Sequence, residues 1–92
     1  AAEQPQPFTL HPAYPNPSNG SVVFSFQVPH QMHVRLDVYN ALGQLVRRVL
    51  KDPYLPGTHR VLFDTSALAS GLYFYRLTAQ GQSMSRRIAI LK

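Results

Sequence analysis

The chain has 92 residues, which suffices for one domain with a single hydrophobic core, because chains of this size bury only about 60–65% of the surface that they expose when unfolded. It contains no cysteine, which excludes a disulfide framework and a thiolate metal site. No apolar run approaches the roughly 20 residues that a membrane-spanning helix requires, so we expect no transmembrane segment.

The formal net charge of +5 raises the question of a nucleic-acid partner. Four of the basic residues form two adjacent pairs, Arg47 with Arg48 and Arg86 with Arg87. Neighbouring side chains of a strand point to opposite faces, so neither pair forms a one-sided basic patch. We therefore expect no nucleic-acid partner, although a generally basic surface attracts anionic partners at low salt.

Residues 1–7 contain two prolines and little that could pack, and they are predicted to be the remnant of a linker from an upstream domain. The chain starts at Ala1 without the basic and apolar regions of a signal peptide, so we expect a fragment of a larger precursor. The folded domain is expected to cover residues 8–92. Its first strand is predicted at Phe8 to Leu10, where apolar and polar residues alternate.

The segment Tyr14-Pro15-Asn16-Pro17 is predicted to be stiff and extended, because each proline fixes its own φ and restricts the residue before it. Asn19-Gly20 then supplies a turn. A clear apolar alternation over residues 22–28 predicts the second strand, which Pro29 ends.

Residues 34–38 predict the third strand, with Asp37 on its outward face and expected to be simply solvated. The sequence Asn40-Ala41-Leu42-Gly43 predicts a type I turn that closes through a left-handed glycine. Residues 44–51 are expected to return as the fourth strand. The inward positions of the third strand are Val34, Leu36 and Val38.

The sequence Leu55-Pro56-Gly57 has the proline and glycine positions of a type II turn, and residues 60–64 alternate as a fifth strand. Residues 65–70 then predict a corner or one short helical turn, with Leu68 filling the core beneath it. The last two strands are predicted at residues 72–78 and 84–91.

These elements together predict an all-β fold, a seven-stranded antiparallel immunoglobulin-like β-sandwich with turns every eight to twelve residues or so. Tyr73 lies two residues before the inward position Tyr75, and we expect it to form a tyrosine corner that bonds to upstream backbone. The cysteines and tryptophan of antibody domains are absent, so the topology is inferred from the pattern alone.

No pattern of catalytic or ligand-binding residues accompanies this fold. The carboxylates lie on separate predicted elements, only two histidines are close together, and no Gly-x-Ser-x-Gly motif occurs. We therefore expect no enzyme activity, cofactor or metal. Carbohydrate binding stays open as an alternative, because aromatic side chains can form a stacking platform, the candidates being Tyr14, Tyr39, Tyr54 and Phe74.

Four motifs in a fixed order carry a family resemblance: Tyr14-Pro15-Asn16-Pro17 with Asn19-Gly20, Asp37-Val38-Tyr39-Asn40-Ala41-Leu42-Gly43-Gln44, Leu68-Ala69-Ser70-Gly71-Leu72-Tyr73-Phe74-Tyr75-Arg76-Leu77, and Arg86-Arg87-Ile88-Ala89-Ile90-Leu91-Lys92. From near Phe8 to the end, the chain resembles the C-terminal sorting domains of type IX (Por) secretion cargo proteins. The resemblance implies an immunoglobulin-like domain that directs an upstream cargo, often a hydrolase, from the periplasm through the outer-membrane translocon. It also implies removal by a surface sortase and attachment of the cargo to anionic lipopolysaccharide at the cell surface.

The resemblance assigns sorting roles to individual residues of this chain. Its motifs correspond here to Pro15, Asn16, Pro17, Asn40, Leu42, Gly43, Gly71, Tyr73, Arg87 and Lys92. The family commonly has lysine near the position of Arg87, and arginine preserves the charge but not the hydrogen-bond geometry. We expect the translocon to recognise the surface of the last two strands, including Arg87 and Lys92. Leu42, an apolar side chain at a turn, either folds back onto the sheet or is offered to a partner.

One further interpretation of the sequence stays open. The domain could be a structural or accessory module of a secreted modular enzyme, similar to fibronectin-like domains, and its deletion would then cause no trafficking defect. Dimerisation through an exposed edge strand is also left open.

Overall fold

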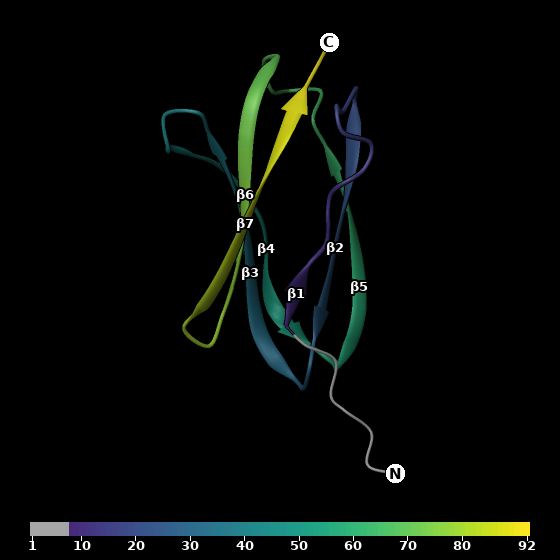
Figure 1. The fold of residues 1–92 in the computed structure, drawn as a ribbon, viewed down its shortest axis with the longest axis vertical. Helices are drawn as coiled ribbons and strands as arrows, with labels where there is room; N and C mark the ends of the chain where they lie inside the picture. The colour runs from purple at the N-terminus through teal and green to yellow at the C-terminus, as the bar shows by residue number, and fades with distance from the viewer. Residues whose placement is uncertain (1–7) are drawn as a thin grey trace.

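The computed structural model describes residues 8–92, so the linker predicted at residues 1–7 lies outside the described part of the chain. The described residues form a sandwich of seven antiparallel strands, which confirms the predicted immunoglobulin-like fold class (Figure 1). The strands are β1 (Thr9–Leu10), β2 (Ser21–Val28), β3 (Met32–Asn40), β4 (Leu45–Tyr54), β5 (Gly57–Asp64), β6 (Gly71–Ala79) and β7 (Gln82–Ile90).

The strands divide into a sheet of three, in the order β1-β2-β5, and a sheet of four, in the order β4-β3-β6-β7. The fourth strand therefore joins the sheet of β3, whereas in constant-type immunoglobulin domains it pairs with the fifth strand. β4 extends to Tyr54, beyond the predicted end at residue 51, and it includes Pro53. An edge strand tolerates proline because one of its sides needs no backbone donor.

Alternating side chains of both sheets fill one core. The largest fully buried side chains are Tyr75, Phe24, Phe26, Leu10, Leu36, Leu77, Ile88, Ile90, Val22, Val28, Val34 and Val38. Leu68 is buried below residues 65–70, as the sequence predicts, and this corner is a turn rather than a helix. Burial of each such side chain contributes about 1.5–3 kcal/mol relative to exposure, so the inward alternation stabilises the fold.

The hydroxyl of Tyr75 links the two sheets. It accepts a hydrogen bond from the backbone N–H of Ala13 at 2.8 Å and donates one to the carbonyl of His11 at 3.2 Å. Its ring packs against Phe24 with the centroids 4.7 Å apart. Burial raises the pKa of the Tyr75 hydroxyl, because the charged phenolate would lose its hydration.

Tyr73 forms the predicted tyrosine corner. Its hydroxyl donates a hydrogen bond to the carbonyl of Ala69, four residues upstream, at 2.8 Å. The bond ties the corner of residues 65–70 to the start of β6.

The segment at residues 14–17 is bent, so the prediction of an extended segment is wrong. Its peptide bonds Tyr14-Pro15 and Asn16-Pro17 are both cis. The bend has a structural reason, because the chain changes sheets here: Tyr14 pairs with Val23 of β2, whereas Ser18 pairs in parallel with Ile90 of β7.

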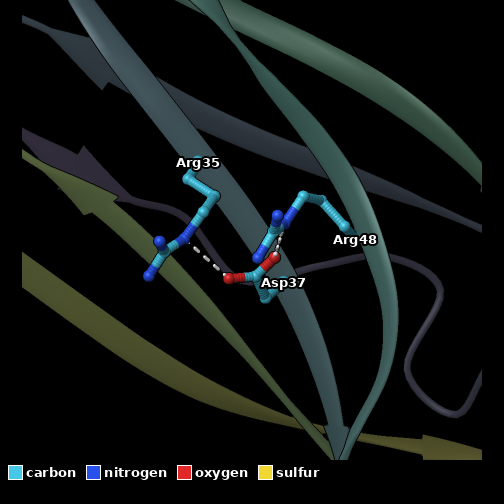
Figure 2. Close-up of polar contacts among 3 residues, drawn as sticks. All are labelled: Arg35, Asp37 and Arg48. Carbon is cyan, nitrogen blue, oxygen red and sulfur yellow. Dashed lines mark hydrogen bonds and ion pairs between the residues drawn. The ribbon is translucent and has the colours of Figure 1, made fainter.

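Asp37 is 1% exposed, so the expectation that it is simply solvated is wrong. β3 lies inside its sheet, and the carboxylate forms ion pairs with Arg35 Nε at 2.9 Å and Arg48 Nε at 3.1 Å (Figure 2). A β-bulge after Leu36 places Arg48, rather than Val49, opposite Asp37. The local alternation correctly predicts the outward face but not the arginines that cover it.

Replacing Tyr75 with phenylalanine tests the link between the sheets. The variant keeps the ring but leaves a buried N–H of Ala13 and the carbonyl of His11 without their partner, so we expect a loss of about 1–3 kcal/mol in unfolding free energy. Urea denaturation measures this loss. The control Tyr39→Phe removes a hydroxyl from the outer face and should change stability by no more than about 0.5 kcal/mol. Equal effects of the two variants would contradict the assignment.

Candidate functional site

The four motif segments meet at one end of the sandwich, which we call the motif end. The loop at residues 15–20, the β3-β4 turn, the corner at residues 65–70 and the end of β7 all lie there (Figure 1). The pairings agree, because Tyr73 is opposite both Asn40 of β3 and Ile88 of β7. β1, where the described chain begins, lies toward the opposite end (Figure 1). Segments that are far apart in the sequence thus lie at the same end of the sandwich.

The first motif supports the edge of β7. The Asn16 side chain accepts a hydrogen bond from the N–H of Ala89 at 3.1 Å and donates to the carbonyl of Arg87 at 3.5 Å. Ser18 continues the contact, since its N–H donates to the carbonyl of Ala89 at 2.8 Å and its carbonyl accepts from Leu91 N–H at 2.9 Å. Pro15 and Pro17, on either side of Asn16, are exposed, and the contact with β7 is made by Asn16 and Ser18.

Ser18 is a structural residue that the sequence reasoning missed. Its side chain is fully buried, and its hydroxyl lies 3.1 Å from Thr65 Oγ1 and donates to the carbonyl of Ser21 at 2.9 Å. A serine after a proline is an ordinary loop residue by sequence, so no local signal distinguishes it. The partner Thr65 is 47 positions away.

The β3-β4 turn has the predicted form. The N–H of Gly43 donates to the carbonyl of Asn40 at 3.0 Å, and Gly43 has a φ of +83°, which glycine adopts without steric cost. The side-chain oxygen of Asn40 accepts from the N–H groups of Leu42 and Gln44, each at 3.0 Å. Asn40 and Gly43 therefore shape the turn, while Leu42 is 83% exposed and does not fold back onto the sheet.

The late motif and the terminal residue are joined at the motif end. Gly71 is the first residue of β6 and pairs with Ile90 of β7. The backbone N–H of Lys92 donates to Ser70 Oγ at 3.0 Å, and its ammonium group donates to the carbonyl of Ser66. Lys92 thus fastens the residues after β7 to the corner at residues 65–70.

Asp64 closes the same corner at the end of β5. The backbone N–H of Ser66 donates to its carboxylate at 2.9 Å. Hydrogen bonding from Ser66, helped by the positive charges of Arg47 and Lys92, lowers the pKa of the Asp64 carboxyl below its ordinary value.

The two arginine pairs diverge, as the strand alternation predicts. Arg86 turns toward the other sheet and donates from Nε to the carbonyl of Leu10 at 2.7 Å. Arg87 is exposed and lies opposite Phe74 in the register, on the outer face of the sheet. Arg48 donates a hydrogen bond to Asp37, whereas the positive charge of Arg47 helps to lower the pKa of the Asp64 carboxyl.

The candidate aromatic residues do not form one platform. Tyr39 and Phe74 are opposite each other on the outer face of the four-stranded sheet. Tyr14 instead pairs with Val23 of the other sheet, and Tyr54 packs edge-on against the core residue Phe26 at 5.2 Å. Within residues 8–92, no group of three or more histidine or acidic residues could hold a metal ion.

A family model for the secretion system C-terminal sorting domain matches residues 12–91. The chain belongs to this family. The match covers the four motifs except for the terminal Lys92, and it identifies the domain as a sorting signal of the type IX secretion kind, which directs export to the outside of the cell or to its surface. Domains of this kind are generally non-catalytic. Searches of curated proteins and of solved structures gave no significant match. Among residues 8–92, no helix is long and apolar enough to cross a membrane.

Replacing Asn16 with alanine should loosen the edge of β7. The variant loses the acceptor for Ala89 N–H and one donor to Arg87, so we expect about 1 kcal/mol of destabilisation and faster exchange of the amide hydrogens of Ala89 and Leu91. Hydrogen exchange followed by NMR measures this. Asn19→Ala, in the same loop, is the matched control. Unchanged exchange at Ala89 would show that Asn16 does not hold the strand.

The lowered pKa of Asp64 makes stability depend on pH. A carboxyl whose folded-state pKa is depressed contributes stability above the unfolded-state pKa, and this contribution is lost as the pH falls through the folded-state pKa. We therefore expect Asp64→Asn to flatten the acid side of the stability profile, measured as urea midpoints over a series of acidic pH values. Asp52→Asn, which removes another exposed carboxyl, should leave the profile steep. Parallel profiles for Asp64→Asn and the parent chain would refute the role of Asp64.

Proposed function

We propose that this domain is the address signal of a larger exported cargo protein, such as a secreted hydrolase, and that the outer-membrane translocon recognises the motif end. The observation that carries the proposal is the convergence of all four family motifs at that end (Figure 1). Residues 1–7 serve as the linker to the cargo and residues 8–92 as the sorting domain. β1 lies toward the opposite end, so an upstream cargo would leave the motif end free.

The motif residues divide into two groups by their contacts. In the first group, the polar side-chain atoms form hydrogen bonds within the chain. Its members are Asn16, Asn40, Tyr73 and Lys92. Leu42 and Arg87 are exposed, and within residues 8–92 the guanidinium group of Arg87 forms no ion pair or hydrogen bond. We assign direct contact with the translocon to Leu42 and Arg87, because arginine is a frequent interface anchor and an exposed apolar side chain offers surface that a partner can bury. The first group holds these two in place.

The later steps of the proposal follow the family. The cargo passes through the periplasm, crosses the outer membrane, and is then released or attached at the cell surface after a sortase removes the domain. The basic character of the domain, with a formal charge of +5, is compatible with an anionic cell surface.

The test must separate recognition from folding. Deleting residues 88–92 would not do so, because Ile88 and Ile90 are core residues with exposures of 2% and 1%. The better variant is Leu42→Ser with Arg87→Glu, which changes exposed side chains only. Fused to a reporter in a host with type IX secretion, it should lower the exported fraction about tenfold or more, since interface anchors each contribute about 2 kcal/mol or more.

The matched control changes the same residue types on the other sheet. Leu62 is 72% exposed on β5, and Arg60 is exposed on the same face, so Leu62→Ser with Arg60→Glu alters charge and polarity equally. The control should be exported normally, and urea denaturation should show both variants folded. Normal export of the Leu42 and Arg87 variant would instead favour a structural module that takes no part in sorting.

A further inference from the structure

The outer face of the four-stranded sheet has an ordered arrangement of side chains. In one row across the strands, Arg48 of β4, Asp37 of β3 and Arg76 of β6 are register partners. The row nearer the motif end consists of Leu45, Tyr39, Phe74 and Arg87. The row on the other side begins with Lys51 and Arg35. Charged side chains thus border directly on an aromatic strip.

The buried carboxylate of Asp37 orients two arginines. Arg35 and Arg48 each approach it through Nε, from opposite sides (Figure 2). Their side chains are 40% and 45% exposed, and their terminal amino groups have no other partner within residues 8–92. The carboxylate holds Arg48 by a hydrogen bond and Arg35 by an ion pair alone, and each guanidinium group keeps donors that a second anion can use.

Arg76 adds a third oriented guanidinium group. It is opposite Asp37 in the register but makes no ion pair with it, and its guanidinium carbon lies 5.1 Å from the centroid of the Tyr39 ring. A cation held over an aromatic face keeps its in-plane donors free. The charge of Arg76 is therefore uncompensated within residues 8–92.

A groove adjoins this cluster on the side of the motif end. It has a volume of about 190 Å³ and is lined by Tyr39, Gly43, Phe74, Arg76 and Ser85. Leu45 and Leu72, which are 49% and 44% exposed, belong to the same outer face. The aromatic walls suit an apolar side chain, and Arg76 places a cation at the border of the groove.

We propose that this outer face is a docking surface for an acidic protein segment that inserts an apolar side chain into the groove and places carboxylates on Arg35, Arg48 and Arg76. Charge complementarity selects this occupant. Five cations face one carboxylate here, namely Arg35, Arg48, Lys51, Arg76 and Arg87 against Asp37, so a second copy of the same face would be repelled. A phosphate-bearing ligand would also satisfy the arginines, and a comparison with polyphosphate distinguishes it from an acidic peptide.

This inference goes beyond the sorting function and does not depend on it, so its test needs no export. The 92-residue chain is labelled with ¹⁵N and titrated with a blocked glutamate-rich peptide that carries one central phenylalanine. Chemical shifts should move at Tyr39, Phe74 and Arg76. Replacing the phenylalanine with serine in the peptide should weaken binding about fivefold, the effect of losing an apolar contact of roughly 1 kcal/mol.

A charge-matched pair of variants locates the site. Arg76→Gln leaves both ion pairs of Asp37 intact and should weaken peptide binding about fivefold, whereas Arg60→Gln, on the other sheet, should weaken it less than about twofold. Thermal unfolding checks that both variants stay folded.

Three outcomes would overturn the proposal. The first is equal weakening by Arg76→Gln and Arg60→Gln, which would mean attraction by net charge alone. The second is tighter binding of short-chain polyphosphate than of the peptide at the same residues, which would assign the face to a phosphate ligand. The third is concentration-dependent dimerisation, seen by sedimentation, that protects this face from the peptide.

Discussion

The pairing of the first motif with the terminal strand is the constraint on which the rest of the domain depends. After β1 the chain leaves the three-stranded sheet and pairs in parallel with the end of β7. This contact joins residues 73 positions apart, through Asn16 and Ala89. It covers one end of an edge strand that would otherwise present unpaired backbone groups, and it brings the motif segments to one end of the sandwich. The bridge from Tyr75 to Ala13 holds the same crossing from inside the core.

Most of the motif residues stabilise the fold, so their contribution to recognition by a partner is indirect. Asn40 and Gly43 stabilise the β3-β4 turn, and this turn exposes the side chain of Leu42 to solvent. Tyr73 and Lys92 secure the corner beside β7, next to the strand that exposes Arg87. Binding of a partner that contacts only two or three side chains therefore still requires the complete folded domain, because those side chains come from separate strands and turns.

The buried carboxylate of Asp37 organises charged side chains on the outer face of the four-stranded sheet. An ionised group so well covered is costly unless it is paired, and Arg35 and Arg48 provide the pairing. Since both arginines remain partly exposed, the arrangement converts flexible cations into oriented donors. The motif end and this basic face are adjacent on the sandwich, and Arg87 lies at their border.

The sequence by itself determined the seven strands apart from the end of β4, the β3-β4 turn, the core position of Leu68 and the bond made by the Tyr73 corner. Each of these depends on local alternation, on glycine and asparagine chemistry, or on a partner a few residues away. Only the tertiary structure decided the bend at residues 14–17, the burial of Ser18 and the ion pairs of Asp37. These features depend on which strands become neighbours and on a bulge that shifts β4. The alternation of apolar and polar residues along a strand contains no information about either.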